Sequence, residues 1–139
     1  MRAPNRTLTI LTAVAALIGV LCIAVSGNAT AREPETLTER VQFAPGTIKD
    51  VLGGALGPGE SRRYLLNARD GQELRVALLP NNAQTHFNIF VPGGEMLYDG
   101  RKGGNYYRGG LYKTGDHVVE VYYLGHEPTS NYEVEIVIE

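Results

Sequence analysis

The chain has 139 residues, a length that suits one domain of ordinary size. Its 13 basic and 15 acidic residues give a formal net charge of −2, a balance that argues against nucleic acid or an anionic membrane surface as the partner. The chain contains one cysteine, so an intrachain disulfide is excluded.

The first 31 residues have the features of an export signal. Arg2 and Arg6 precede an uncharged, mainly apolar run over residues 8–25, and an Ala-x-Ala sequence ends at Ala31. We predict a signal peptide over residues 1–31, cleaved after Ala31, and a periplasmic or secreted mature protein. An uncleaved anchor is the alternative, because the apolar run approaches the length that spans a membrane.

The single cysteine, Cys22, lies inside this predicted leader and lacks the small preceding residues that lipid attachment requires. A mature chain from Arg32 to Glu139 would therefore hold no cysteine and no lipid anchor, and we expect no membrane association after cleavage. It would carry 11 basic and 15 acidic residues, a formal charge of 11 − 15 = −4. Residues 32–36 are polar and include Pro34, which predicts a flexible tail.

Residues 37–139 show short alternating apolar runs separated by turn signals, and no window has the 3.6-residue period of a helix. This pattern predicts a single all-β domain of about eight to nine short strands, either an antiparallel β-sandwich or a small barrel. We favour the sandwich. The expected strands cover residues 40–43, 47–52, 61–68, 72–79, 86–91, 96–98, 106–112, 117–124 and 132–138.

Several of these segments carry more specific signals. Asp70-Gly71 lies between two alternating runs, a strong signal for a hairpin. Residues 117–124 are the best candidate for a central strand. Residues 99–105 are expected to be a loop, and Gly109-Gly110 indicates a bulge or a close backbone approach. Three sets of apolar residues are each expected to share one face of a strand: Leu74, Val76 and Leu78; Phe87, Ile89 and Val91; and Val119, Val121 and Tyr123. In the last strand, Tyr132, Val134, Ile136 and Ile138 are expected to face inward.

Motifs for catalysis or for binding a cofactor or metal are not found. The three histidines (86, 117 and 126) have no metal-ligand spacing, and no segment matches a calcium loop or a phosphate-binding loop. The two serines after the leader, Ser61 and Ser130, lie in no nucleophile elbow. We therefore expect a protein that is not an enzyme and needs no cofactor or metal.

Residues 86–124 hold six of the eight tyrosines, together with a cluster of basic residues. Arg101, Lys102, Tyr106, Tyr107 and Arg108 mix cations with aromatic rings. Single-stranded nucleic acid is one possible partner for such a mixture, but an acidic exported protein suits it poorly. A protein partner, in particular an acidic cleft, fits better because Tyr and Arg are enriched at binding hot spots.

The same region resembles the bacterial inhibitors of g-type (goose-type) lysozyme. The matching residues are Phe87, Asn88, Ile89, Pro92, Gly93, Gly100, Gly104, Asn105, Tyr107, Gly109, Leu111, Gly115, Asp116, Val121 and Tyr122. Upstream, VQFAPGT (41–47) and NARDGQELRV (67–76) are similar too. The latter segment and the Gly-Asp turn also resemble the broader pre-peptidase C-terminal type of β-sandwich.

The resemblance implies a β-sandwich inhibitor that occludes the cleft of a g-type lysozyme, or binds another cell-wall-directed protein, through a loop rich in Gly, Tyr and Arg. The residues expected to contact the partner are Arg101, Lys102, Asn105, Tyr107, Arg108 and His126.

One feature departs from the family. Where its members carry arginines after the Gly-Asp turn, this chain has Glu120 and the segment 125–130. Three explanations are consistent with this difference. The cluster of Arg101, Lys102 and Arg108 takes the place of the missing arginines, the target differs, or inhibition has been lost. A non-inhibitory carbohydrate- or protein-binding module of the cell envelope and a structural accessory domain are the alternative functions.

Overall fold

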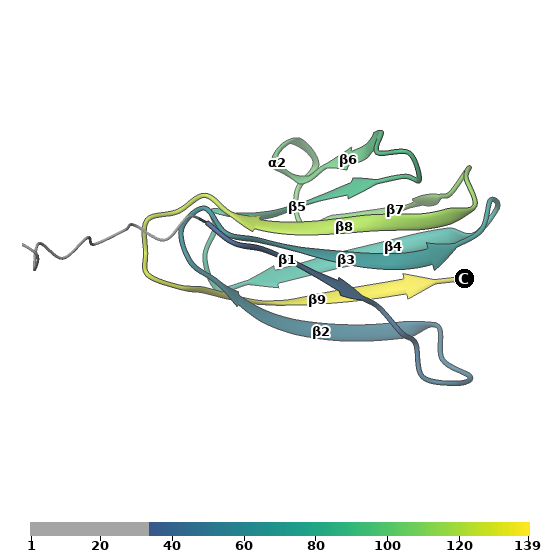
Figure 1. The fold of residues 1–139 in the computed structure, drawn as a ribbon, viewed down its shortest axis with the longest axis horizontal. Helices are drawn as coiled ribbons and strands as arrows, with labels where there is room; N and C mark the ends of the chain where they lie inside the picture. Colours follow the sequence, from purple (N-terminus) through teal and green to yellow (C-terminus); the bar gives the residue numbers. More distant parts are fainter. Residues whose placement is uncertain (1–33) are drawn as a thin grey trace, which may run out of the picture. The chain divides into compact units, whose positions relative to one another are not determined.

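The computed structural model describes residues 34–139, which hold nine β-strands and one short helical turn (Figure 1). The elements are β1 (Thr36–Arg40), β2 (Lys49–Leu56), β3 (Ser61–Ala68), β4 (Glu73–Pro80), β5 (Thr85–Phe90), β6 (Met96–Asp99), α2 (Gly100–Gly103), β7 (Tyr106–Gly110), β8 (Gly115–Tyr123) and β9 (Ser130–Ile138). The predicted signal peptide and its cleavage site lie outside the described residues. Strand β1 begins at Thr36, within the tail expected for residues 32–36.

The strands form two packed sheets, so the predicted all-β sandwich is confirmed. Sheet A has the order β1-β3-β8-β5-β6, and sheet B has the order β2-β9-β4-β7. Neighbouring strands are antiparallel except β1 and β3, which are parallel. Strand β8 is the middle strand of sheet A, as the sequence predicted.

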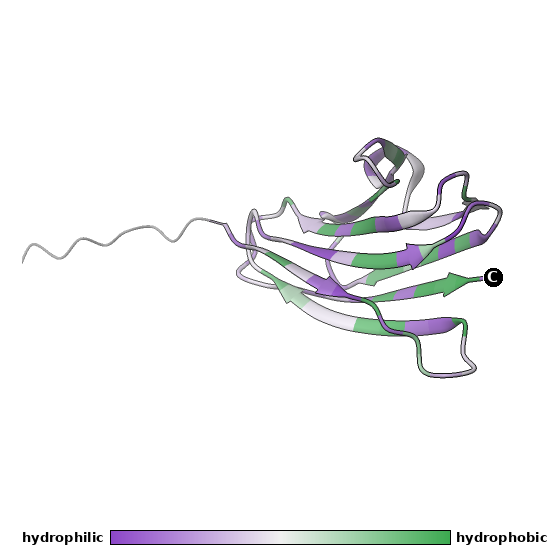
Figure 2. Ribbon diagram, turned by 45° about the vertical axis from the view of Figure 1, so that its right-hand side comes forward, coloured by the Kyte–Doolittle hydropathy of each residue, from purple (hydrophilic) through white to green (hydrophobic). Residues whose placement is uncertain are grey.

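The core lies between the sheets and is built by alternation along each strand. Figure 2 shows hydrophobic and hydrophilic residues alternating along the strands. The four residues predicted to face inward, Tyr132, Val134, Ile136 and Ile138, are buried, and so are the nine residues predicted to share strand faces within 74–78, 87–91 and 119–123. In the core the hydroxyl groups of Tyr64 on β3 and Tyr132 on β9 form a buried hydrogen bond of 2.7 Å from one sheet to the other. Because each buried hydroxyl has a partner, the bond avoids the cost of an unsatisfied polar group.

The expected hairpin at Asp70-Gly71 is wrong, although Gly71 has the positive φ of 92° that was anticipated. Strand β3 pairs with β1 and β8, and β4 pairs with β7 and β9, so the turn carries the chain from one sheet to the other. The backbone N–H groups of Asp70 and Gly71 donate to Thr114 Oγ1 (3.0 Å) and to the Leu111 carbonyl (2.9 Å). These contacts with a distant segment, rather than local turn chemistry, decide the direction of the chain.

Two adjacent glycines of β2, Gly53 and Gly54, differ in how closely the core packs against them. A Cβ at Gly54 would overlap the ring of Tyr132, whereas a Cβ at Gly53 would have no neighbour nearer than 3.9 Å. We expect Gly54→Ala to lower the free energy of unfolding by about 1–3 kcal/mol because the buried phenol must shift. Gly53→Ala is the matched control and should leave stability unchanged or raise it, since alanine reduces the freedom of the unfolded chain. Urea unfolding measures both, and equal effects would contradict this packing.

The buried imidazole of His117 on β8 should make the folded state less stable at acidic pH. Its ring is fully buried, Nδ1 donates to the Gly115 carbonyl at 3.0 Å, and Nε2 has no partner among residues 34–139. Burial lowers the pKa of His117 below its ordinary value of 6.5. The unfolded chain therefore takes up the proton first, and stability should decline as the pH falls below about 6.5.

We expect His117→Leu to reduce the decline in melting temperature between pH 7.5 and pH 5, whereas His126→Leu, at an exposed position, should leave it unchanged. A residual slope should remain, because burial also lowers the pKa of His86. If the His117 variant kept the full slope, the buried imidazole would not be its source.

Candidate binding site at the β6–β7 edge

The connection from β6 to β7 is a folded turn rather than an irregular loop. Residues 99–105, here called the cationic turn, contain α2, which projects beyond the strands in Figure 1. The Asp99 carboxylate caps α2 by accepting from the Arg101 N–H at 3.0 Å, and the Gly104 N–H donates to the Gly100 carbonyl at 2.9 Å. The expectation of a loop is corrected: a cap and a closing hydrogen bond shape this segment.

The cationic turn is fixed to sheet A by close backbone contacts. Gly100 lies against the backbone of Phe87, where any Cβ would overlap the carbonyl group. Its N–H donates to Asn88 Oδ1 at 3.3 Å. The Tyr98 hydroxyl lies 2.8 Å from the Gly104 carbonyl oxygen and 3.0 Å from that of Tyr106, so one proton is shared between the two acceptors. The turn is therefore held at both ends.

Three aromatic rings join the sheets below the turn. The ring centroids of Phe87 and Tyr98 are 5.2 Å apart, and those of Tyr98 and Tyr107 are 5.1 Å apart, within the range of favourable aromatic pairs. Tyr107 is half-buried against the core, and its phenol occupies the space where a Cβ of Gly109 would lie. A bulge or a close approach to the backbone was expected at Gly109-Gly110. The Tyr107 phenol lies against the Gly109 backbone, and β7 pairs with β4 in a continuous register without a bulge.

The two basic residues of the turn differ from most other basic residues of the domain. Arg101 and Lys102 are exposed, and within residues 34–139 their side chains form no ion pair or hydrogen bond. Six other basic side chains pair with carboxylates, namely Arg40, Lys49, Arg63, Arg75, Arg108 and Lys113, whereas Arg62 and Arg69 have no ion pair among the same residues. Burial and the nearby Arg101 guanidinium lower the pKa of His86, which places the positive field of the turn beside sheet A.

The six residues predicted to contact a partner fall into two groups. Arg101, Lys102 and Asn105 share the cationic turn, and all three are exposed. The other three have different surroundings. Tyr107 packs below the turn, Arg108 pairs with Glu73 at 2.8 Å on the outer face of sheet B, and His126 lies in the β8–β9 loop beside Gln84 and Leu124.

Tyr106 is a surface residue that belongs to the cluster of cations and aromatic rings noted in the sequence but is not among the six predicted contacts. Its side chain is 56 % exposed and adjoins Asn105, whereas Tyr107 faces inward. Neighbouring residues of a strand face opposite sides, so burial of one ring exposes the other. The signal available in the sequence was the alternation of Tyr107 and Gly109, which assigns the inward face of β7.

The position at which the family resemblance implied an arginine has an internal role here. Glu120 on β8 pairs with Arg63 on β3, with 3.0 Å between Oε2 and Nε. The Arg63 guanidinium also lies 5.8 Å from the centre of the Phe90 ring, a cation–π distance. The outer face of sheet A therefore carries a neutralised pair at this point instead of a free cation.

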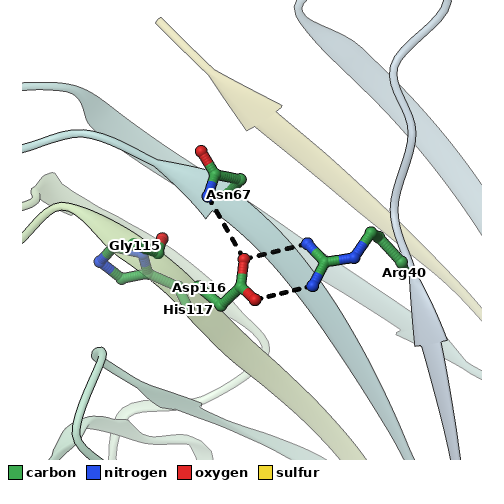
Figure 3. A network of polar contacts seen from close by, with 5 residues as sticks. All are labelled: Arg40, Asn67, Gly115, Asp116 and His117. Atoms are coloured by element: carbon green, nitrogen blue, oxygen red, sulfur yellow. Dashed lines mark hydrogen bonds and ion pairs between the residues drawn. The ribbon is translucent and has the colours of Figure 1, made fainter.

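A second network on sheet A is structural (Figure 3). Arg40 on β1 binds Asp116 on β8 with two hydrogen bonds of 2.9 and 2.7 Å, and Asn67 donates to the same carboxylate at 3.4 Å. The Arg40 and Asn67 hydrogen bonds lower the pKa of Asp116 to about 2. The pairing ties the edge strand β1 to the sheet and leaves neither charge free for a ligand.

Residues 34–139 contain no group of three His, Cys, Asp or Glu residues arranged to hold a metal ion. Within the same residues, no helix has the length and apolar character needed to cross a membrane.

The sequence matches no protein-family model and no curated protein. Three solved structures share the fold. The Aeromonas hydrophila PliG, a periplasmic inhibitor of g-type lysozyme, has a TM-score of 0.68 at 23 % identity, covering 76 % of this chain and 99 % of that one. The Salmonella Typhimurium PliG has a TM-score of 0.58 at 22 % identity, covering 74 % and 98 %. A mutant of the Escherichia coli PliG has a TM-score of 0.57 at 19 % identity, covering 75 % and 98 %. The chain therefore has the β-sandwich fold of these inhibitors.

The Tyr98 hydroxyl should be what holds the cationic turn in place. We expect Tyr98→Phe to lower the free energy of unfolding by about 1 kcal/mol and to speed hydrogen exchange at the Gly104 amide, since two carbonyl groups lose their donor. Tyr122→Phe is the matched control, because that hydroxyl makes only a 3.4 Å contact with Asn88. Unchanged exchange at Gly104 in the Tyr98 variant would show that other contacts fix the turn.

Proposed function

We propose that the mature domain is a periplasmic or secreted inhibitor of lysozyme, with g-type lysozyme as its target. Support comes from the fold shared with three proteins that bear that description. It also comes from the glycines and Asn105 of the cationic turn, which match the inhibitor pattern in sequence. The first argument concerns the whole sandwich, and the second concerns its β6–β7 edge.

The observation that carries the proposal is a rigid turn that presents two unpaired cations. Enzymes that hydrolyse glycosidic bonds place carboxyl groups at the scissile bond. Arg101 and Lys102 can pair with such groups through charge-assisted hydrogen bonds, without first breaking an ion pair of their own. Because Tyr98 and Gly100 already hold the turn, little conformational entropy is lost on binding.

The surroundings of the turn refine the proposed contacts. We assign Arg101 and Lys102 to the acidic groups of the cleft, and Asn105 and Tyr106 to the positions where the enzyme binds sugar. Tyr107 acts as a support for the turn because its ring packs against Tyr98. Arg108 contributes less than the turn does, since its guanidinium is already bound to Glu73, and His126 is at most a peripheral contact.

The ion pair between Glu120 and Arg63 affects the electrostatic attraction between the domain and the enzyme. A free carboxylate on sheet A would repel an acidic cleft, and the ion pair removes that repulsion. The unpaired positive charge at the β6–β7 edge of the sandwich then comes from Arg101 and Lys102. Inhibition should therefore weaken as salt is added, because the two exposed cations are screened.

Removing both cations tests the proposal. In a turbidity assay of cell-wall lysis by purified g-type lysozyme, we expect the mature domain to inhibit. Arg101→Ala combined with Lys102→Ala should raise the inhibition constant by about 10- to 100-fold, the range of a binding hot spot. The matched control is Arg69→Ala with Lys113→Ala, which removes the same charge from other loops.

Circular dichroism spectra and melting temperatures establish that both double variants are folded. The proposal fails if the unaltered domain at micromolar concentration inhibits neither g-type nor c-type nor i-type lysozyme. The assignment of the turn fails separately if the control pair weakens inhibition as much as the Arg101 and Lys102 pair.

A further inference from the structure

The outer face of sheet B contains a shallow groove that shares Asn105 with the proposed lysozyme contacts but lies mostly outside them. Its floor is Gly53 of β2, and its walls include Leu79, Asn81, Asn131 and Glu133. Gly53 and Leu79 are both register partners of Glu133, so the three form one row across β2, β9 and β4. The groove exists because Gly53 has no side chain to fill the row.

The polar groups in this groove are available for a ligand. The side chains of Asn105 and Asn131 form no hydrogen bond within the described part of the chain. Asn81 uses its Oδ1 to accept from the Asn131 N–H at 3.0 Å, which leaves its amino group free. Planar amides offer both donors and acceptors, which suits hydroxyl and acetamido groups.

Apolar surface lies beside these amides. Leu79 is 63 % exposed, more than any other large hydrophobic residue in the described chain. The exposed ring of Tyr106 is the register partner of Ala77, two residues from Leu79 on the same face of β4. Exposed apolar surface next to unpaired amides matches the C–H faces and hydroxyl edges of a sugar ring.

The negative charge of the groove disfavours anionic ligands. Its one ionisable wall residue is Glu133, which has no ion-pair partner among residues 34–139. The nearby cations of β4 and β7, Arg75 and Arg108, pair with Glu139 and Glu73. An anionic ligand would meet an uncompensated carboxylate, so phosphorylated, sulfated or uronic-acid chains are disfavoured.

We propose that this groove binds a neutral oligosaccharide, with N-acetylated chains as the preferred class. The activity goes beyond inhibition of lysozyme and uses a surface that overlaps the proposed inhibitory contacts only at Asn105 and the neighbouring Tyr106. Asn105 lies at the junction, because it follows α2 and also lines the groove.

The test is a titration of the mature domain with chitotetraose, followed through the side-chain amide resonances of its asparagines. We expect the amides of Asn105 and Asn131 to shift in a saturable manner at ligand concentrations up to about 10 mM. Asn131→Ala should weaken binding about three- to tenfold, the loss of one hydrogen bond.

Gly53→Val is the decisive variant, because it fills the floor of the groove. A Cβ at this position meets no atom nearer than 3.9 Å, so we expect the variant to fold, and its melting temperature checks this. We expect binding to weaken by about tenfold or more. Gly110→Val is the matched control: it adds the same side chain to open space on the same face, opposite Glu73. That variant should bind chitotetraose as tightly as the unaltered domain.

Two outcomes would overturn the proposal: no saturable shift with chitotetraose, or equal loss of binding in the Gly53 and Gly110 variants. Tetralysine or tetragalacturonate binding in the groove more tightly than chitotetraose would also overturn it, since the ligand would then be charged. Failure here is separable from failure of lysozyme inhibition. Gly53→Val should still inhibit lysozyme, and the Arg101 and Lys102 double variant should still bind chitotetraose.

Discussion

The contact on which this molecule depends is the position of Tyr98 between the two sheets. Its ring packs against Phe87 of sheet A and Tyr107 of sheet B, and its hydroxyl holds the carbonyl groups of Gly104 and Tyr106. One side chain therefore closes the β6–β7 edge and shapes the turn that connects the sheets. The apolar part of the phenol stabilises the packing, and its polar tip orders the backbone.

The β6–β7 edge carries two neighbouring cations that have no ion pair in the described part of the chain. Along the sheets, most basic residues are neutralised by carboxylates on neighbouring strands, as in Arg63 with Glu120 and Arg108 with Glu73. Arg101 and Lys102 escape this pairing because α2 carries them beyond the strands (Figure 1). A domain with more acidic than basic residues thus presents a localised positive site, and a localised field is what steers an acidic partner.

The cationic turn and the groove of sheet B are adjacent surfaces with different chemistry. The turn presents two unpaired cations, whereas the groove is lined by residues that include amides, a leucine and one carboxylate. Asn105 lies at the junction, where the carbonyl group of this residue also accepts from the Leu78 N–H at 2.8 Å. A protein that acts on cell-wall enzymes and also binds neutral glycans would remain close to the substrate of its target, which links the two proposals physically.

The sequence by itself determined the fold class, the residues that share each strand face and the central place of β8, because alternation with a period of two is a local property. It also identified Arg101, Lys102 and Asn105 as neighbours, since they share one short connection. Only the tertiary structure decided that Asp70-Gly71 joins two sheets, that Arg108 is bound to Glu73, and that Gly53 and Leu79 meet across Glu133. These outcomes depend on which distant strands pair, and local turn and strand preferences are compatible with more than one pairing.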